Sequence, residues 1–192
     1  VNVEEQQPKQ WRKDWIYFRA QTPGDEQIAL AYRQKGSLDK WINAVQVLGN
    51  YPRAQLALYA TFVPPLLPIL DAPNFIIDWF GRTSTGKTTA LRVAASVWGK
   101  PDERDPQSAI ATWDATRVWL ERASSILNGI PLILDDTKRA RHPQQVSDLL
   151  YAVASGRGRG RGNIKSTAVT AHWRTVLLST GEAPATSFTQ DG

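Results

Sequence analysis

The sequence GRTSTGKT at residues 81–88 has the spacing G-x-x-x-x-G-K-[ST] that is typical of a phosphate-binding loop. An apolar segment at 75–80, FIIDWF, precedes it, and residues 88–98 have the spacing of an amphipathic helix that ends at Gly99. The motif therefore stands between a predicted strand and a predicted helix. A glycine-rich turn with one surface lysine, the plainer interpretation, does not account for both flanking elements.

Each fixed position of this loop has a chemical role. Gly81 and Gly86 let the backbone curl until its amide hydrogens point at a phosphate, and the helix that follows adds its positive N-terminal dipole. Lys87 would reach the β- and γ-phosphates of ATP as a catalytic group, and the Thr88 hydroxyl would ligate Mg²⁺. The predicted nucleotide-binding residues are Gly81, Arg82, Thr83, Ser84, Thr85, Gly86, Lys87, Thr88 and Thr89.

A second apolar run, IPLIL at 130–134, is followed by Asp135 and Asp136, which is the pattern of a Walker B strand. Asp135 would hold Mg²⁺ with Thr88, directly or through water, and Asp136 would orient the attacking water. Many motor ATPases have a glutamate at the second position, so with the shorter aspartate hydrolysis could be slow, use a shifted water or be absent. Two acids after a strand are common at surface turns, but behind a phosphate loop they favour a metal site.

The last predicted strand, at 172–180, ends in two hydroxyl residues. In motor-type P-loop ATPases, the strand after Walker B ends in a polar residue that senses the γ-phosphate. Ser179 or Thr180 fits that place, and we take Thr180 as the catalytic candidate. Asp78 interrupts the apolar run at 75–80, and we expect it to make a structural hydrogen bond rather than to take part in catalysis.

Composition limits the other classes of site. The 192 residues, 42% of them hydrophobic, can supply one domain-sized core. No stretch approaches the ~20 apolar residues of a membrane span, so we expect a cytoplasmic chain without a membrane partner. The absence of cysteine excludes disulfides and thiolate metal sites, and His142 and His172 form no cluster. Any metal is therefore expected to arrive with the nucleotide.

Basic residues gather in one segment of the chain. The net charge is +5, yet residues 138–174 alone contain eight Lys and Arg against one acid, Asp148. Arginines alternate with glycines there, which suits close contact with nucleic-acid phosphates. The alternatives are an arginine that reaches a neighbouring subunit's ATP site and a solvated loop. The predicted nucleic-acid contacts are Arg157, Arg159, Arg161 and Lys165.

The remaining elements follow from turn and capping signals. Residues 15–19 and 27–33 flank the turn TPGD at 22–25 and predict a β-hairpin. Two helices are predicted at 38–48, capped by Ser37, and at 53–63; a strand at 108–112, a helix capped by Asp114 and a helix from Pro143 follow. We expect an N-terminal tail and hairpin at 1–35, a helical lead-in at 36–72 and an α/β core at 73–192.

Several blocks together resemble a known family. They are GSLDKW from Gly36, the long block from Gly81 to Gly99, LILDD from Leu132, SGRGRGRG from Ser155 and WRTVLLSTGE from Trp173. In these the chain is similar to the domain-of-unknown-function 927 family, helicase-like P-loop ATPases of phages and mobile elements. The resemblance implies a RecA/AAA+-like P-loop NTPase core with a mainly parallel sheet, related to the ring helicases of superfamily 3 and MCM type. In those helicases a hairpin inserted at the position of the Arg-Gly segment grips DNA in the pore.

The resemblance therefore implies an ATP-dependent DNA helicase or translocase, with single-stranded or forked DNA and a homo-oligomeric ring as partners. The alternatives are a nucleotide-binding switch or scaffold and, less favoured, a P-loop kinase. The chain departs from the family at Walker B, where it has Asp135-Asp136 in place of the usual Asp-Glu. Family members also continue into a further strand, so we expect the chain to be a fragment whose arginine finger lies elsewhere.

Overall fold

The computed structural model describes residues 18–160, 162–163, 166–167 and 169–189. Its centre is a parallel sheet with the order β1-β6-β3-β2. These strands are β1 (Phe75–Phe80), β2 (Ala111–Thr112), β3 (Leu132–Asp135) and β6 (Val176–Gly181). Leu178 of β6 is in register with Ile77 on one side and Ile133 on the other. The expected α/β class with a parallel sheet is confirmed.

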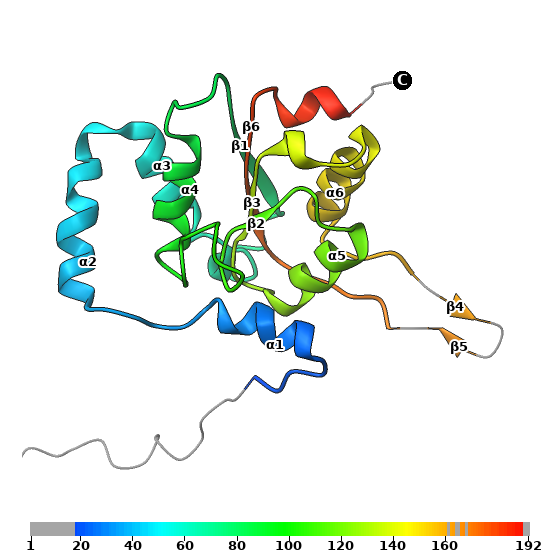
Figure 1. Cartoon of the computed structure of the whole chain (residues 1–192). Coiled ribbons are helices and arrows are strands. Elements are labelled where there is room, and N and C mark those ends of the chain that lie inside the picture. Colours follow the sequence, from blue (N-terminus) through cyan, green and yellow to red (C-terminus); the bar gives the residue numbers. More distant parts are fainter. Residues whose placement is uncertain (1–17, 161, 164–165, 168, 190–192) are drawn as a thin grey trace, which may run out of the picture.

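Helices cover both faces of this sheet (Figure 1). One face carries α3 (Pro52–Ala60) and α4 (Lys87–Ala95), and the other carries α5 (Arg117–Ile126) and α6 (Pro143–Ser155). Ile133 and Leu178 pack on the α4 side, whereas Leu134 and Leu177 pack on the α5 and α6 side. Since strand side chains alternate between faces, successive polar residues at the strand ends also lie on opposite faces of the sheet.

The predicted N-terminal hairpin is wrong in its second strand. Residues that were expected to continue a strand form helix α1 (Pro23–Leu30). The hydroxyl of Thr22 accepts a hydrogen bond from Asp25 N at 3.2 Å, and proline stands at the first helical position. These two local signals start a helix and outweigh the β-branched and aromatic pattern. Residues 15–17 of the first expected strand lie outside the described residues.

The two helices predicted at 38–48 and 53–63 both form, with shorter bounds. Helix α2 (Leu38–Val45) continues into the 3-10 turn η2 (Gln46–Asn50), and η3 (Pro64–Leu66) follows α3. Ser37 occupies the N-cap position of α2 but makes no side-chain capping bond. Asp114 does not cap α5; Thr116 does, accepting from Trp119 N at 3.3 Å. Within the described residues, no helix is long and apolar enough to cross a membrane.

An antiparallel hairpin interrupts the chain between α6 and β6. Arg157 and His172 form a β-bridge, and Gly158 N donates to Ala171 O at 2.8 Å. Farther out, β4 (Gly162–Asn163) pairs with β5 (Ser166–Thr167), and this hairpin extends away from the body of the molecule (Figure 1). It leaves α6 at Gly156, whose φ is 67° and whose position leaves no room for a Cβ beside Asn74 and the Trp173 carbonyl.

Candidate nucleotide-binding site

The loop between β1 and α4 has the backbone shape that an anion cradle requires. Gly81 and Gly86 have φ angles of 137° and 85°, and Ser84 between them has a φ of 60°. These left-handed conformations turn the chain sharply before α4 begins at Lys87. The N-terminal amides of α4 and its dipole then lie at the carboxyl end of β1, the edge of an α/β sheet at which ligands bind.

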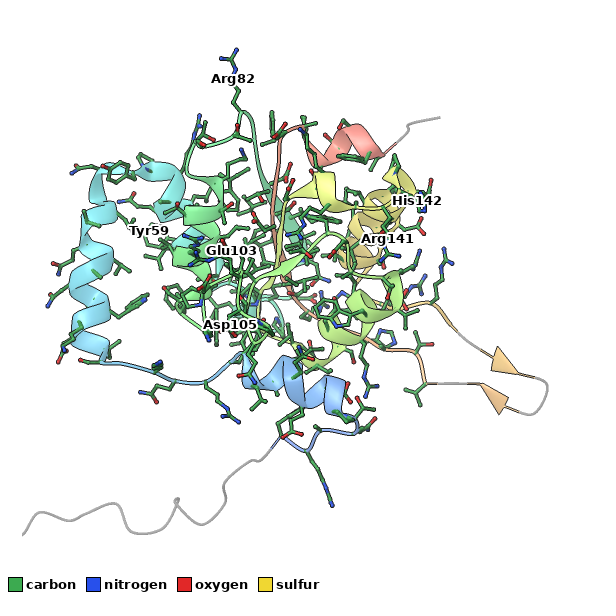
Figure 2. All side chains as sticks on the ribbon, viewed as in Figure 1. Tyr59, Arg82, Glu103, Asp105, Arg141 and His142 are labelled. Atoms are coloured by element: carbon green, nitrogen blue, oxygen red, sulfur yellow. The ribbon has the colours of Figure 1, made fainter. Side chains whose placement is uncertain are left out.

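Lys87 lies folded over this loop. Its Nζ donates to Gly81 O at 2.8 Å and to Arg82 O at 2.7 Å. These are bonds to neutral carbonyls, so an anionic phosphate in the cradle would be a stronger acceptor for the same ammonium. The Arg82 side chain itself is exposed and points away from the body (Figure 2). Within the loop, Arg82 thus contributes its carbonyl, while its side chain lies away from the predicted ligand.

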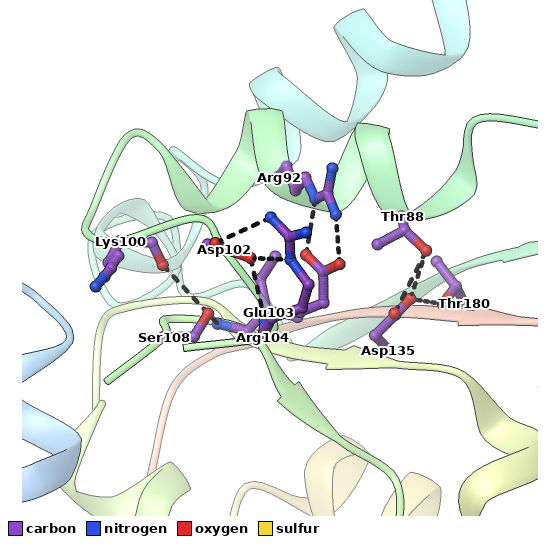
Figure 3. Close-up of polar contacts among 10 residues, drawn as sticks. Thr88, Arg92, Lys100, Asp102, Glu103, Arg104, Ser108, Asp135 and Thr180 are labelled. Carbon is purple, nitrogen blue, oxygen red and sulfur yellow. Dashed lines mark hydrogen bonds and ion pairs between the residues drawn. The ribbon is translucent and has the colours of Figure 1, made fainter. Parts of the chain in front are cut away.

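Three elements bring their polar groups together beside the loop (Figure 3). The Thr88 hydroxyl from α4 donates to Asp135, 3.1 Å from Oδ1 and 3.3 Å from Oδ2. The Thr180 hydroxyl from β6 donates to Asp135 Oδ1 at 2.6 Å and accepts from Asp136 N at 3.0 Å. The structure thus brings together residues that are 47 and 45 positions apart in the sequence.

This cluster fits an octahedral Mg²⁺. Metal–oxygen distances of about 2.1 Å place neighbouring ligand oxygens about 3.0 Å apart. The Thr88 and Asp135 oxygens are 3.1 Å apart, so both could bind the ion with a small adjustment. A hydroxyl and a carboxylate are oxygen ligands of the kind that Mg²⁺ prefers. Among the described residues, no separate cluster of three His, Cys, Asp or Glu side chains could hold a metal.

Asp136 stands at the end of β3 with an unusual backbone, φ 63° and ψ 90°. Its Oδ1 accepts from Lys138 N at 3.2 Å and caps the short η4 turn (Thr137–Arg139). The next residue, Thr137, is buried against Gly181, where a Cβ would come within 2.2 Å of the Thr137 hydroxyl. Asp136 therefore reaches the site on a turn whose shape is fixed by close packing.

A cavity of about 390 Å³ joins these groups. It is lined by four carboxylates and two cations, so acids outnumber bases around it. Three of these charged residues, Arg92, Glu103 and Glu182, were not predicted from the sequence. The spacing of Arg92, four residues after Thr88 on the same helix face, is a signal that could have identified it. The lining residues are Thr83, Ser84, Gly86, Lys87, Thr88, Thr89, Arg92, Glu103, Asp135, Asp136, Thr180, Gly181 and Glu182.

Two polar strand residues are directed away from this cavity. Ser179 faces the opposite side of the sheet and accepts a hydrogen bond from Trp113 Nε1 at 3.2 Å. Strand alternation therefore leaves Thr180, and not Ser179, at the site. Asp78 accepts from Ala185 N at 2.8 Å and so holds the η5 turn (Ala185–Phe188) to β1, which confirms the structural role expected for it.

Comparison with known proteins identifies the family. The sequence profile described as "Domain of unknown function (DUF927)" matches residues 10–173. The chain belongs to the DUF927 family. Among curated proteins no sequence matches it. A solved structure described as "SCCmec type IV Cch - active helicase" is similar, with a TM-score of 0.68 and 26% identity. The match covers 82% of this chain and 29% of the helicase chain, so this DUF927 chain spans less than a third of that protein.

Two of the predicted nucleic-acid residues of this DUF927 domain, Arg157 and Arg159, are not among the residues that line the cavity. Arg157 is exposed at the base of the hairpin, and Arg159 lies 3.4 Å from Asp148 of α6. Arg161 and Lys165 lie outside the described residues. The hairpin base precedes the first residue of β6, whereas Thr180 lies near its last. The base of the hairpin and the cavity therefore lie at opposite ends of strand β6.

Proposed function

We propose that this chain is the ATP-binding core of a helicase-like DNA translocase, in which Mg²⁺-dependent hydrolysis of ATP drives movement along DNA. The similarity to a structure described as an active helicase supports a helicase-like function. The chain shares its fold with that helicase over 82% of its length, and the proposal adds the nucleotide, the metal and the reaction. It also takes the core to be of the RecA/AAA+ type, as part of a homo-oligomeric ring related to superfamily 3 and MCM helicases.

The observation that carries the proposal is the bonded cluster of Thr88, Asp135 and Thr180 beside the Lys87 loop. An anion-binding loop alone would suit any anion. A carboxylate held by two hydroxyls from different elements also supplies a divalent-metal site directly next to the cradle. A phosphate-binding loop with a metal-binding cluster next to it is the arrangement that a Mg²⁺–triphosphate requires.

The charge of the cavity explains why the metal is needed. Its lining contains Asp135, Asp136, Glu103 and Glu182 but only Lys87 and Arg92 as cations. A bare triphosphate would be repelled by the excess of carboxylates. Asp135 and Thr88 would hold Mg²⁺, whose charge would offset part of the repulsion between the carboxylates and the phosphates. Nucleotide binding should therefore depend strongly on the metal.

The residues of the chain divide the work of hydrolysis. Lys87 would exchange its two carbonyl acceptors for phosphate oxygens and stabilise the charge that develops on them. Asp136 would accept a proton from the water that attacks the γ-phosphorus. Thr180 fixes both acids, since its hydroxyl donates to Asp135 and accepts from the Asp136 amide. Loss of the γ-phosphate would shift Asp135 or Asp136, and the Thr180 hydroxyl would transmit that shift to β6.

Strand β6 would connect the nucleotide to DNA. It runs from the foot of the basic hairpin to Thr180, and both of its sides are hydrogen-bonded within the sheet. Arg157 and Arg159, with Arg161 and Lys165 farther along the segment, would contact phosphates of single-stranded or forked DNA. A hairpin that projects from the body suits insertion between strands or into a ring pore (Figure 1).

The test is ATP hydrolysis by the full-length protein with and without single-stranded DNA, alongside Lys87→Ala. DNA should stimulate hydrolysis, and the variant should abolish the stimulated rate. Stimulation that persists in Lys87→Ala would contradict the proposal. The outcome that favours the second candidate, a nucleotide-dependent switch, is tight ATP binding without turnover. The Asp136 carboxylate favours the switch, because it is short and already accepts a hydrogen bond from Lys138 N.

A further inference from the structure

A second acid of the cavity has a definite partner. Glu103, in the segment between α4 and β2, accepts two hydrogen bonds from the Arg92 guanidinium of α4. One of them, from Nε to Oε2, is 2.7 Å long. The Glu103 side chain is only 17% exposed, and both residues line the cavity. This is a two-pronged pair in which the carboxylate is sheltered, although the Arg92 side chain is 43% exposed.

The segment around Glu103 explains why this pair matters. Its other ion pairs, Lys100 with Asp105 and Arg104 with Asp102, stay within the segment. Within the part of the chain that the structure describes, the Arg92–Glu103 pair is the one ion pair that joins the segment to α4. It holds a carboxylate at the cavity wall in a fixed orientation, because the guanidinium fork leaves little freedom.

The pair lies next to the predicted metal ligands (Figure 3). Arg92 is one helical turn after Thr88, so both side chains leave the same face of α4. The hydrogen bond that Arg92 donates to Glu103 is the main cause that raises the pKa of Arg92, and the negative charge of Asp135 adds to it. That same bond lowers the pKa of Glu103, which keeps its carboxylate ionised. An ionised, oriented acceptor therefore lies in the wall of the same cavity as the residues proposed to hold Mg²⁺.

A bound Mg²⁺ would bring water molecules that such an acceptor can hydrogen-bond. The ion keeps several of its waters in protein sites, and each water needs hydrogen-bond acceptors. Asp135 is already bound by two hydroxyls, and Asp136 accepts from Lys138 N. Glutamate reaches one methylene farther than either. Both Glu103 oxygens accept from Arg92, yet each carboxylate oxygen can accept more than one hydrogen bond, and Glu103 lines the same cavity as Asp135.

We propose that Glu103 accepts hydrogen bonds from the water shell of the bound Mg²⁺, and that Arg92 is the positioning residue that holds Glu103 in place. The inference rests on the nucleotide site proposed above and adds two residues to it. Groups in this outer layer commonly change metal affinity by about 10- to 100-fold when they are replaced.

The test is binding of a fluorescent ATP analogue, titrated with Mg²⁺, for the wild type, Glu103→Gln and Arg92→Gln. Glu103→Gln should raise the Mg²⁺ concentration at half-saturation by about 10-fold, while binding of the analogue in excess chelator stays as in the wild type. Asp102→Asn, a matched change at the neighbouring carboxylate outside the cavity lining, should leave the Mg²⁺ midpoint unchanged. A wild-type midpoint in Glu103→Gln would overturn the inference.

A charge-swapped variant separates this role from a structural one. Arg92→Glu with Glu103→Arg restores an ion pair, so a merely structural pair would recover both its thermal stability and its Mg²⁺ midpoint. The inference predicts recovered stability with a raised midpoint, and recovery of both would overturn it. If the wild type binds no nucleotide, the proposed function fails; if it binds nucleotide with Mg²⁺ and Glu103→Gln behaves in the same way, only the inference fails.

Discussion

The Thr180 hydroxyl lies 2.6 Å from Asp135 Oδ1 and 3.0 Å from the backbone nitrogen of Asp136. One hydroxyl thus joins both acids that end β3 to the neighbouring strand β6. Ser179, the adjacent residue, instead accepts from Trp113 in the core. The two hydroxyls have different roles because successive strand residues face opposite sides of the sheet.

Thr180→Val should impair hydrolysis more than binding. The variant keeps the side chain's shape but removes a hydrogen bond to a charged group, which contributes about 1.5–3 kcal/mol. ATP turnover should fall by about 10- to 100-fold, with a much smaller change in ATP affinity, as measured by steady-state kinetics and equilibrium binding. Ser179→Ala is the matched control, because it should lower stability and leave turnover per folded molecule unchanged. Equal losses of turnover in both variants would contradict this assignment.

Asp78→Ala should destabilise the fold without touching the site. The Ala185 amide would lose its acceptor, so the free energy of unfolding should fall by about 1–3 kcal/mol in urea denaturation. Asp78→Asn keeps an acceptor oxygen at this position, and it should lose less stability than the alanine variant. If both variants were as stable as the wild type, the hydrogen bond to η5 would have no structural role.

Replacing Arg157 and Arg159 with glutamine should weaken DNA binding in a salt-dependent manner. For single-stranded DNA, each lost phosphate contact should reduce the slope of log affinity against log salt by about 0.7. Fluorescence anisotropy at several salt concentrations measures this slope. Arg53→Gln, at an exposed position of α3, is the control and should keep the wild-type slope. A double variant with the wild-type slope would exclude these arginines from the DNA contact.

Stability should fall at acidic pH because of Asp25. Its buried side chain accepts from Arg122, and this hydrogen bond lowers the pKa of Asp25 from 3.8 to about 2. Since the folded pKa is the lower one, the contribution is fully present above about pH 4 and is lost as the pH falls towards about 2. Urea denaturation across this range should show a smaller decline for Asp25→Asn than for the wild type. Parallel profiles would contradict the effect.

Local sequence signals predicted much of this architecture. The 81–88 motif, the apolar run before Asp135 and the periodicity after Pro143 each depend on neighbouring residues, and their elements form where expected. The choice between Ser179 and Thr180 depended on which face of a strand points to α4, which required the sheet. The Arg92–Glu103 pair depends on the path of an irregular segment and has no local signature. The N-terminal hairpin was mispredicted because the Thr22-Pro23 capping signal was read as a turn.

ATP binding by the full chain, measured by calorimetry with Mg²⁺, with excess chelator and in Lys87→Ala, tests the central claim most directly. The account predicts saturable binding that weakens by at least about 10-fold when either the metal or the Lys87 ammonium is removed, since each supplies charge-assisted contacts to phosphate. Binding of equal strength in all three conditions would show that the 81–88 loop and the Thr88–Asp135 cluster are not a Mg²⁺–ATP site.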